Sequence, residues 1–244
     1  MVRYRKTLIA LLTTSALLAA CGGSDSEPPK ASLRVAHFAP DVPAVDVFLK
    51  SPGAANSAGN RLLQNVSFPA ATAYSSVNAG TYDASAALAG TLTGVVNLNG
   101  ANLAGGTSTS VFATGLLGGT GAQALALRAY VDDRTPASGK AKVRVIHLSP
   151  DAPAVDVVVL AGGAIAARPV TNLAYPNATA TPLLLDPGTY TLAVVPAGAT
   201  TPVLPSAAGV PVTLAAGDVD TVVAIGALAA PGAQPFQLKV LDDR

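Results

Sequence analysis

The sequence is poor in the residues that usually build metal, disulfide and catalytic sites. It contains one cysteine, two histidines and no tryptophan among 244 residues. A single cysteine excludes a disulfide within the chain. The histidines, His37 and His147, stand 110 residues apart, so no zinc-ligand spacing is present. The scattered glycines lack the form of a phosphate-binding loop, and without tryptophan no aromatic platform for sugars is evident.

Charge is also scarce, at 12% of the residues. When Arg3, Arg5 and Lys6 are set aside, twelve basic residues face fourteen acidic ones. This balance lacks the basic footprint of nucleic-acid binding, so we expect no nucleic-acid partner. It also shows no polybasic patch for lipid head groups.

The N-terminal segment has the features of an export signal. Thr7–Ala20 is apolar and uncharged, follows three basic residues, and is too short to span a bilayer comfortably. These features predict a signal peptide over residues 1–20. Its end, LAAC, resembles the bacterial lipoprotein lipobox, which implies cleavage before Cys21 and acylation of that residue. The alternative is an ordinary signal peptide followed by a stray cysteine.

Residues 21–31 are polar and rich in Gly, Ser and Pro, which predicts a flexible tether between lipid and folded chain. Several acyl chains on one residue give stable membrane anchoring. We therefore expect a lipid-anchored protein of the bacterial cell envelope. By analogy with lipoprotein sorting in enterobacteria, Gly22 after the cysteine permits the outer membrane.

One stretch of sequence occurs twice. LRVAHFAPDVPAVDV at 33–47 returns as VRVIHLSPDAPAVDV at 143–157, with ten identical positions. Later pairs support a duplication: FP and YP, two GTY triplets, Gly115 and Gly226, and two DDR endings. We expect repeat 1 over residues 32–134, a linker over 135–141 and repeat 2 over 142–244. Because the linker is short, the two modules are expected end to end.

Within each repeat, strand-like runs recur every eight to twelve residues, with Gly, Pro and Asp between them. In repeat 2 the expected strands are 142–148, 154–160, 168–174, 178–185, 189–195, 210–214, 218–226 and 235–241. This spacing predicts an all-β fold, with two tandem immunoglobulin-like antiparallel β-sandwich domains. Tyr190, which starts a strand after Pro-Gly-Thr, can anchor its hydroxyl as in a tyrosine corner; simple packing is the alternative.

The duplicated stretch predicts a strand, a corner stiffened by two prolines, and a second strand. Its shared polar and proline positions form one candidate structural motif: His37, Pro40, Asp41, Pro43 and Asp46 in the first copy, and His147, Pro150, Asp151, Pro153 and Asp156 in the second. The aspartate between the prolines favours a turn. Asp46 is expected to point away from the face that carries its valine neighbours.

Each histidine is expected on the valine side of its strand, close to the corner. A structural role fits best, with the ring bonded to Asp41 or to a backbone carbonyl that the turn leaves free. A His–Asp pair for acid–base catalysis and a metal or ligand role are the alternatives. Ser149 follows His147, but Ala39 takes its place in the first copy, so a serine nucleophile has little support. The Asp-Asp pairs at 132–133 and 242–243 are expected as solvated strand ends.

The pattern R-V-x-H-x-[SA]-P-D-x-P-A-V-D-V, with a later G-T-Y strand, resembles the bacterial domain of unknown function numbered 4397. Residues 34–47 and 144–157 carry the resemblance. It implies secreted or envelope proteins, often with tandem domains, and an immunoglobulin-like sandwich. It implies no activity and no cofactor.

Three functions remain in competition. The first is a non-enzymatic envelope lipoprotein that binds a partner, such as an envelope protein or glycan, or acts as a scaffold. The second is a lipoprotein that binds a small ligand or glycan. The third is a hydrolase that uses His37 or His147. Because loops carry function on sandwich folds, the loops are where a binding site is expected.

Overall fold

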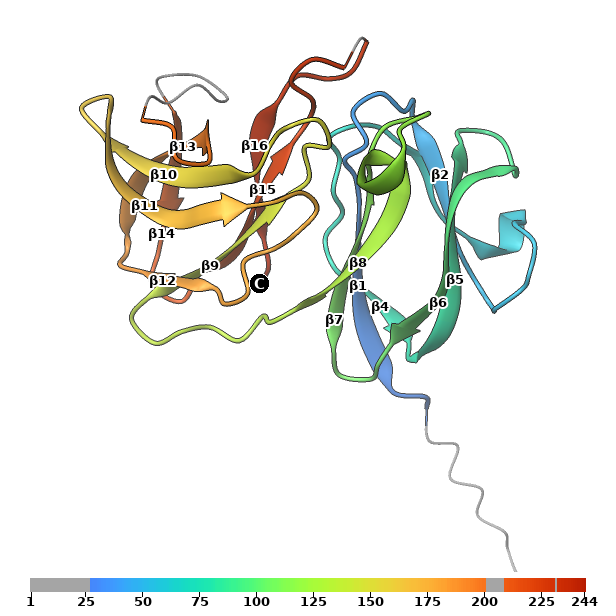
Figure 1. Cartoon of the computed structure of the whole chain (residues 1–244). Coiled ribbons are helices and arrows are strands. Elements are labelled where there is room, and N and C mark those ends of the chain that lie inside the picture. Colours follow the sequence, from blue (N-terminus) through green and yellow to red (C-terminus); the bar gives the residue numbers. More distant parts are fainter. Residues whose placement is uncertain (1–26, 201–208, 231) are drawn as a thin grey trace, which may run out of the picture.

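The computed structural model describes residues 27–200, 209–230 and 232–244. Throughout this part the chain is all-β, with two short 3-10 turns, η1 (Ala58–Asn60) and η2 (Gly121–Gln123), as its helical elements. Figure 1 shows two β-sandwiches that lie side by side. The fold class predicted from the strand spacing is confirmed.

The first sandwich contains two four-stranded sheets, ordered β4-β1-β7-β8 and β3-β2-β5-β6. Its strands are β1 (Lys30–His37), β2 (Val45–Lys50), β3 (Arg61–Val66), β4 (Ser75–Asn78), β5 (Gly80–Leu88), β6 (Gly94–Leu103), β7 (Ser108–Thr114) and β8 (Ala126–Asp132). The proline-containing corner carries the chain from β1 in one sheet to β2 in the other.

The second sandwich repeats this topology strand for strand, with sheets β12-β9-β15-β16 and β11-β10-β13-β14. Its strands are β9 (Ala141–His147), β10 (Val155–Ala161), β11 (Ala164–Leu173), β12 (Leu183–Leu185), β13 (Gly188–Pro196), β14 (Val210–Leu214), β15 (Val219–Ile225) and β16 (Gln237–Asp242). Each strand falls within a few residues of its predicted run, except β12, which is much shorter than 178–185. Pro182 has no N–H to donate to a ladder, and the strand begins only after it.

One ladder in each sandwich is parallel, whereas the sequence predicted antiparallel sheets. Strand β1 pairs in parallel with β7, and β9 with β15. The chain crosses from β6 in one sheet to β7 in the other, and β7 then runs in the same direction as its neighbour β1. This crossover between sheets is a tertiary feature that strand spacing does not reveal.

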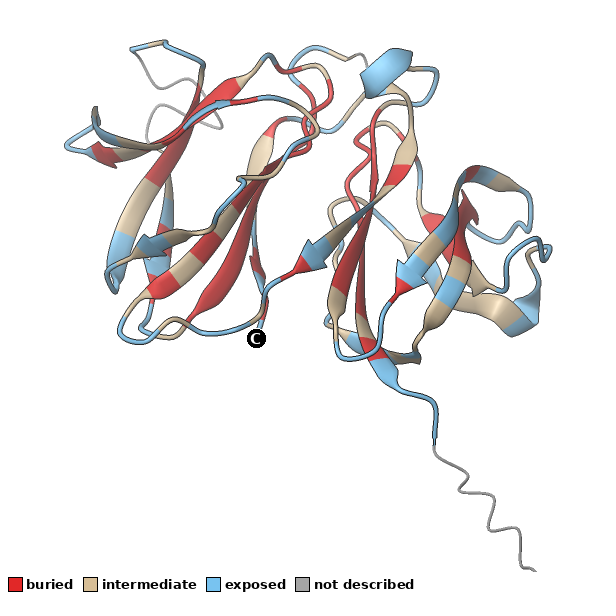
Figure 2. Cartoon of the chain, turned by 60° about the horizontal axis from the view of Figure 1, so that its bottom comes forward, coloured by how far each residue is buried: buried red, intermediate tan, exposed pale blue. Residues whose placement is uncertain are grey.

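Strand β1 is buried on both of its faces. Leu33 and Val35 point into the core between the two sheets of the first sandwich, while Ala36 and Phe38 point outward and are also buried. Strand β9 behaves in the same way, with Val143 on the inner face. Figure 2 shows buried residues along both strands that face the neighbouring sandwich. Strands buried on both faces have near-continuous apolar runs, and these two do.

The outward faces of β1 and β9 belong to an apolar cluster between the sandwiches. Its buried members come from both repeats: Ala36, Phe38, Phe112, Ile146, Leu148, Val223, Ile225 and Leu241. The sheets β4-β1-β7-β8 and β12-β9-β15-β16 therefore pack face to face, and the molecule has four layers (Figure 1). The predicted end-to-end arrangement is wrong, because the short linker folds back and lets two sheet faces bury apolar area.

Candidate functional site

Each of the two duplicated corners is organised by its histidine, which is buried in both repeats. His37 Nε2 lies 3.0 Å from the carbonyl oxygen of Pro43 and 3.2 Å from that of Val42, and its Nδ1 accepts from the backbone N–H of Ala39 at 3.3 Å. A ring that donates from Nε2 and accepts at Nδ1 is neutral. Burial lowers the pKa of His37 below its ordinary value.

His147 makes the equivalent contacts, to the carbonyl oxygen of Pro153 at 3.0 Å and from the backbone N–H of Ser149 at 3.3 Å. Burial also lowers its pKa. The serine contributes its backbone amide to this ring, and its buried hydroxyl has no hydrogen-bond partner in the described part of the chain. The imidazole thus bonds to carbonyls that the turn frees, which was one of the two structural alternatives.

The turn aspartates contact a different loop. Asp41 accepts the backbone N–H of Leu117 with both carboxylate oxygens, at 3.0 and 2.9 Å. Asp151 accepts the N–H groups of Leu228 at 2.8 Å, Ala229 at 2.8 Å and Ala230 at 3.1 Å. Each aspartate therefore fastens its corner to the loop that follows β7 or β15.

The prolines of the corners have different contacts. Pro43 and Pro153 offer their carbonyl oxygens to the histidines, as described above. The carbonyl of Pro40 accepts the backbone N–H of Gln234 in the second sandwich, at 2.8 Å. Pro150, at the equivalent place, begins the turn that contains Asp151. The first corner is thus part of the contact between the sandwiches.

Asp46 points away from the valine face, as predicted, and holds two loops. It accepts the backbone N–H of Asn65 at 2.9 Å and that of Gly90 at 3.1 Å. The bond from Asn65 is the main cause that lowers the pKa of Asp46. Asn65 has φ 51°, a left-handed conformation that asparagine tolerates better than most residues.

Asp156 repeats this arrangement in the second sandwich. It accepts from Asn172 N–H at 2.8 Å and Gly198 N–H at 3.1 Å, and Asn172 has φ 52°. Arg168 adds an ion pair with Asp156 at 2.6 Å. Asn65 and Asn172 therefore occupy equivalent left-handed positions in the two sandwiches.

The residues that sequence reasoning missed lie between the sandwiches, where two ion pairs cross in opposite directions. Arg34 of the first sandwich pairs with Asp243 of the second at 2.6 Å, and Arg144 of the second pairs with Asp132 of the first at 2.5 Å. Each carboxylate also accepts a hydroxyl from its own sandwich at 2.6 Å, Asp132 from Ser110 and Asp243 from Thr221.

The two ion pairs relate the sandwiches by a pseudo-two-fold axis. Arg34 of the first sandwich contacts Asp243 of the second, and the equivalent residues, Arg144 and Asp132, make the same contact in the opposite direction. The backbone bonds agree: Arg34 Nη1 donates to the carbonyl of Asp242 at 3.3 Å, and Arg144 Nη1 to that of Val131 at 3.1 Å. In the strand registers, Ser110 lies opposite Tyr130 and Thr221 opposite Leu241. Asp132 is therefore the counterpart of Asp243.

The prediction that the Asp-Asp pairs are solvated strand ends is wrong for one member of each pair. Asp132 and Asp243 are buried, 7% and 3% exposed, at the centre of the contact. Asp133 and Asp242 remain exposed. Aligning the two DDR triplets in the sequence pairs Asp132 with Asp242, one residue away from its structural counterpart, Asp243. The sequence alignment therefore concealed the equivalence. The sequence feature that could have indicated this contact is the arginine of the RV dipeptide in each repeat, Arg34 and Arg144.

Two tyrosines complete this contact. The Tyr74 ring lies between two guanidinium groups, 4.6 Å from Arg34 and 4.2 Å from Arg134, and its hydroxyl donates to Asp132 at 2.9 Å. Burial, followed by the nearby carboxylates, raises the pKa of Tyr74. Tyr130 donates its hydroxyl across the contact to the carbonyl of Pro176 at 2.7 Å, and burial raises its pKa to about 12.

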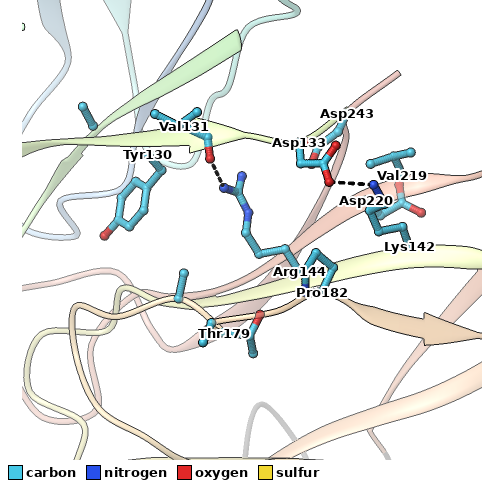
Figure 3. Close-up of a pocket in the computed structure, with 13 residues that line it drawn as sticks. Tyr130, Val131, Asp133, Lys142, Arg144, Thr179, Pro182, Val219, Asp220 and Asp243 are labelled. Carbon is cyan, nitrogen blue, oxygen red and sulfur yellow. Dashed lines mark hydrogen bonds and ion pairs between the residues drawn. The ribbon is translucent and has the colours of Figure 1, made fainter. Parts of the chain in front are cut away.

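A pocket of about 390 Å³ opens beside the Arg144–Asp132 pair. Strand β8 of the first sandwich forms one wall, and β9 with the segment before β12 forms the other. Figure 3 shows Arg144 directed at the carbonyl of Val131, and Lys142 directed at Asp133 at 2.8 Å. Pocket size falls within the range of about 300–1,000 Å³ that is usual for small-ligand sites.

The predicted acylation site, Cys21, and the signal peptide over residues 1–20 lie outside the described residues. In the described ranges, no helix is long and apolar enough to cross a membrane. The same ranges contain no cluster of three or more His, Cys, Asp or Glu side chains arranged for a metal ion.

These features define a class of protein: paired β-sandwiches that share a polar and apolar contact, with duplicated corners held by histidine and aspartate. The chain belongs to the family described as Domain of unknown function (DUF4397), which matches residues 31–158, just over half of its length. The matched region contains all of the first sandwich except the first residue of β1, and it continues through the corner of the second sandwich into β10.

Comparison with curated proteins finds no match. Among solved structures, the chain is similar to the Bacillus anthracis TIE protein, with 9% sequence identity and a TM-score of 0.24. The alignment covers 80% of this chain and 33% of that protein, so the chain spans about a third of its length.

Proposed function

We propose that this protein is a lipid-anchored envelope lipoprotein whose two sandwiches, each a copy of the family domain, act together as a non-enzymatic binding or scaffold module. The anchor is expected at Cys21, behind a signal peptide, and Gly22 is compatible with the outer membrane. The observation that carries the scaffold role is the contact between the sandwiches. Its reciprocal buried ion pairs and shared apolar cluster favour one body over two freely jointed domains.

The placement of the loops supports a binding role at the end remote from the membrane. The tether joins the start of β1 at Lys30, whereas the corner lies at the other end of that strand (Figure 1). The loops fastened by Asp41 and Asp151 lie beside the corners and present two equivalent leucines, Leu117 at 58% exposure and Leu228 at 42%. An envelope protein or glycan is the expected partner class.

The surroundings of the histidines favour a structural role over hydrolysis. In both corners Nε2 is engaged by a backbone carbonyl and Nδ1 by a backbone N–H. A general base needs a nitrogen that can reach a substrate proton. The first sandwich has alanine where the second has Ser149, so the two corners share no nucleophile.

Metabolic labelling with palmitate tests the anchor. The native chain is expected to incorporate label and to fractionate with membranes, and Cys21→Ala should lose both properties. Ser24→Ala, in the same tether, serves as the control and should keep both. Unchanged labelling and fractionation of Cys21→Ala would refute the lipoprotein proposal.

The binding role has its own test with the acylated protein as bait in envelope extract. A specific partner should be retained by the native chain and lost with the double variant Leu117→Asp/Leu228→Asp. Leu184→Asp is the control, because Leu184 is 59% exposed on β12, away from these loops. Equal capture by both variants would place the binding surface elsewhere.

A further inference from the structure

One carboxylate in the pocket beside Arg144 has no cation as its partner. Three other carboxylates around the pocket form ion pairs, at 2.8, 2.5 and 2.6 Å: Asp133–Lys142, Asp132–Arg144 and Asp243–Arg34. Asp220 also lines the pocket, and it forms neither a hydrogen bond nor an ion pair within the described residues. Together these four carboxylates and three cations leave one negative charge without a neutralising partner in the same ranges.

Arg244 lowers the pKa of Asp220, but its guanidinium is engaged by two other carboxylates. It pairs with Asp218 at 2.9 Å and with Asp242 at 3.2 Å. Burial is the main cause that raises the pKa of Asp220 to about 6, and repulsion from three neighbouring aspartates adds to the rise. At neutral pH the carboxylate is therefore ionised, and an uncompensated charge in a buried position is costly. A perturbed carboxylate in a cleft is typical of a binding site.

The Asp220 carboxylate can be reached from the pocket. The residue as a whole is 9% exposed. Neither of its oxygens belongs to the fully buried polar atoms that lack a partner. Because these oxygens have no hydrogen bond among the described residues, they must keep contact with solvent. Figure 3 shows Asp220 at one end of the pocket and Tyr130 at the other.

The apolar part of the lining is small-chained. It consists of Ala129, Val131, Ala178, Ala180, Pro182 and Val219. Apolar walls in a pocket of about 390 Å³ suit a short hydrocarbon body. The sign of the guest's charge follows from the ion pairs, because the two cations in the lining, Lys142 and Arg144, are already bonded to carboxylates. A cationic guest can use the carboxylate that has no partner.

The pseudo-two-fold axis offers a comparison within the same molecule. In the strand registers Asp220 lies beside Val143, and Thr109 lies beside Leu33. Thr109 is therefore the counterpart of Asp220 and carries no charge. The hollow on that side of the contact has a volume of about 340 Å³, and its charged lining consists of Arg34, Lys239, Arg244 and Asp242. Cations outnumber carboxylates there, so a cationic guest should prefer the pocket of Asp220.

We infer that the pocket beside Arg144 binds a small primary amine as its ammonium ion, with Asp220 as the counter-ion and a short aliphatic body against the apolar walls. An ammonium group has three N–H donors, and its hydrogen bonds to a carboxylate are charge-assisted and strong. The site is built by both repeats. It does not depend on lipid anchoring or on the loops at the remote end, so it goes beyond the proposed envelope function.

The test titrates hexylamine into residues 21–244 carrying Cys21→Ala, at pH 7.5, with ligand-observed NMR as the readout. The amine is protonated at this pH, as a lysine side chain is. Hexylamine is expected to bind saturably. Hexanol, which lacks the charge, and hexanoate, which reverses it, should bind about tenfold or more weakly, because the charge-assisted hydrogen bond is lost.

Asp220→Asn removes the counter-ion and keeps the shape of the side chain. It relieves a buried charge, so the variant should fold at least as well as the parent, which a thermal melt checks. Its affinity for hexylamine should fall about tenfold or more. Asp186→Asn is the matched control, because Asp186 is 76% exposed and pairs with Lys140 on the surface. This variant should bind hexylamine as the parent does.

Lys142→Met tests the sign of the pocket's charge. It removes an ammonium group from the lining and frees Asp133, so hexylamine should bind as tightly as to the parent or up to about fivefold more tightly. Four results would overturn the inference: no saturable binding of hexylamine at millimolar concentration, equal affinity for hexanol or hexanoate, unchanged binding by folded Asp220→Asn, or weaker binding by folded Lys142→Met.

Discussion

Arg34, on the first strand of the first sandwich, lies 2.6 Å from Asp243, at the end of the second sandwich 209 positions later. Both side chains are almost completely buried, and the counterpart pair Arg144–Asp132 crosses in the other direction. The two sandwiches thus exchange charged groups, as the subunits of a symmetric dimer do. The reciprocal pairing makes each half of the chain dependent on the other for the neutralisation of a buried charge.

Arg34→Met is expected to destabilise the protein by about 3–5 kcal/mol, because it leaves the buried Asp243 carboxylate without its cation. The double variant Arg34→Met/Asp243→Asn should recover much of this loss, since asparagine removes the charge and still accepts from Thr221. Chemical denaturation of the single and double variants measures the coupling. If the losses of stability from the two substitutions simply add in the double variant, the coupling between Arg34 and Asp243 is contradicted.

The surface pair Lys140–Asp186 is the control for this cycle. Its side chains are 43% and 76% exposed, and exposed pairs contribute only about 0–1 kcal/mol. Lys140→Met should therefore leave the free energy of unfolding nearly unchanged. An equally large effect at this pair would mean that burial does not determine the strength of the Arg34 pair.

His147→Ala should lower the free energy of unfolding by roughly 1–3 kcal/mol, because the Pro153 carbonyl and the Ser149 amide lose their buried partner. For a chain of this size the melting temperature falls by about 2–4 °C per kcal/mol. His147→Gln, which keeps one donor and one acceptor, should lose less. Unchanged melting of His147→Ala together with lost binding or activity would contradict the structural role.

Asp220→Asn should stabilise the protein at pH 7.5 and not at pH 4. Burial, followed by the repulsion of Asp218, Asp242 and Asp243 and only partly offset by Arg244, raises the pKa of Asp220 to about 6. A raised folded-state pKa means that the ionised form destabilises the fold above about pH 6, and the penalty vanishes below the unfolded value.

We expect a difference of roughly 1 kcal/mol between Asp220→Asn and the parent at pH 7.5, after allowance for solvent screening. Thermal melts at both pH values measure it. Asp186→Asn, which replaces an exposed carboxylate, controls for general charge effects. A stabilisation that is independent of pH would exclude titration of Asp220 as its cause.

Gly226→Ala should destabilise far more than Gly217→Ala. Both glycines have the left-handed φ that disfavours alanine, 86° and 85°. At Gly226 an added Cβ would lie 2.1 Å from the carbonyl oxygen of Pro235, whereas at Gly217 it would meet nothing within 4 Å. Gly217→Ala isolates the backbone cost of about 1–2 kcal/mol, and urea denaturation of both variants measures the excess from the clash.

Local sequence was sufficient for the secondary structure. The alternation of Val143 and Val145 with other residues, and the Gly and Pro between runs, predicted eight strands of the second repeat because side-chain period and turn chemistry are local properties. The tyrosine corner is also present: Tyr190 donates to the carbonyl of Asp186 at 2.8 Å, and Tyr82 to that of Asn78 at 2.9 Å.

Local sequence was partly sufficient for the corners. The local sequence identified His37 as a structural residue. The proline-stiffened turn explains why its buried ring bonds to the backbone carbonyls of Val42 and Pro43. The local sequence did not reveal that Asp41 would bond to Leu117, 76 positions away. A carboxylate can bond its own turn or any nearby loop, and only the packing of β7 beside β1 selects the loop.

The sequence by itself determined that this chain forms strands, repeats itself and carries the pattern of its family, because these properties depend on neighbouring residues and on internal identity. Only the tertiary structure decided that the sandwiches lie face to face, that Arg34 meets Asp243 across the pseudo-two-fold axis, and that the Tyr74 ring covers Arg34. Each of these contacts joins segments more than 30 residues apart. The free energy that selects them comes from burial and charge pairing between whole sheets, which no local pattern encodes.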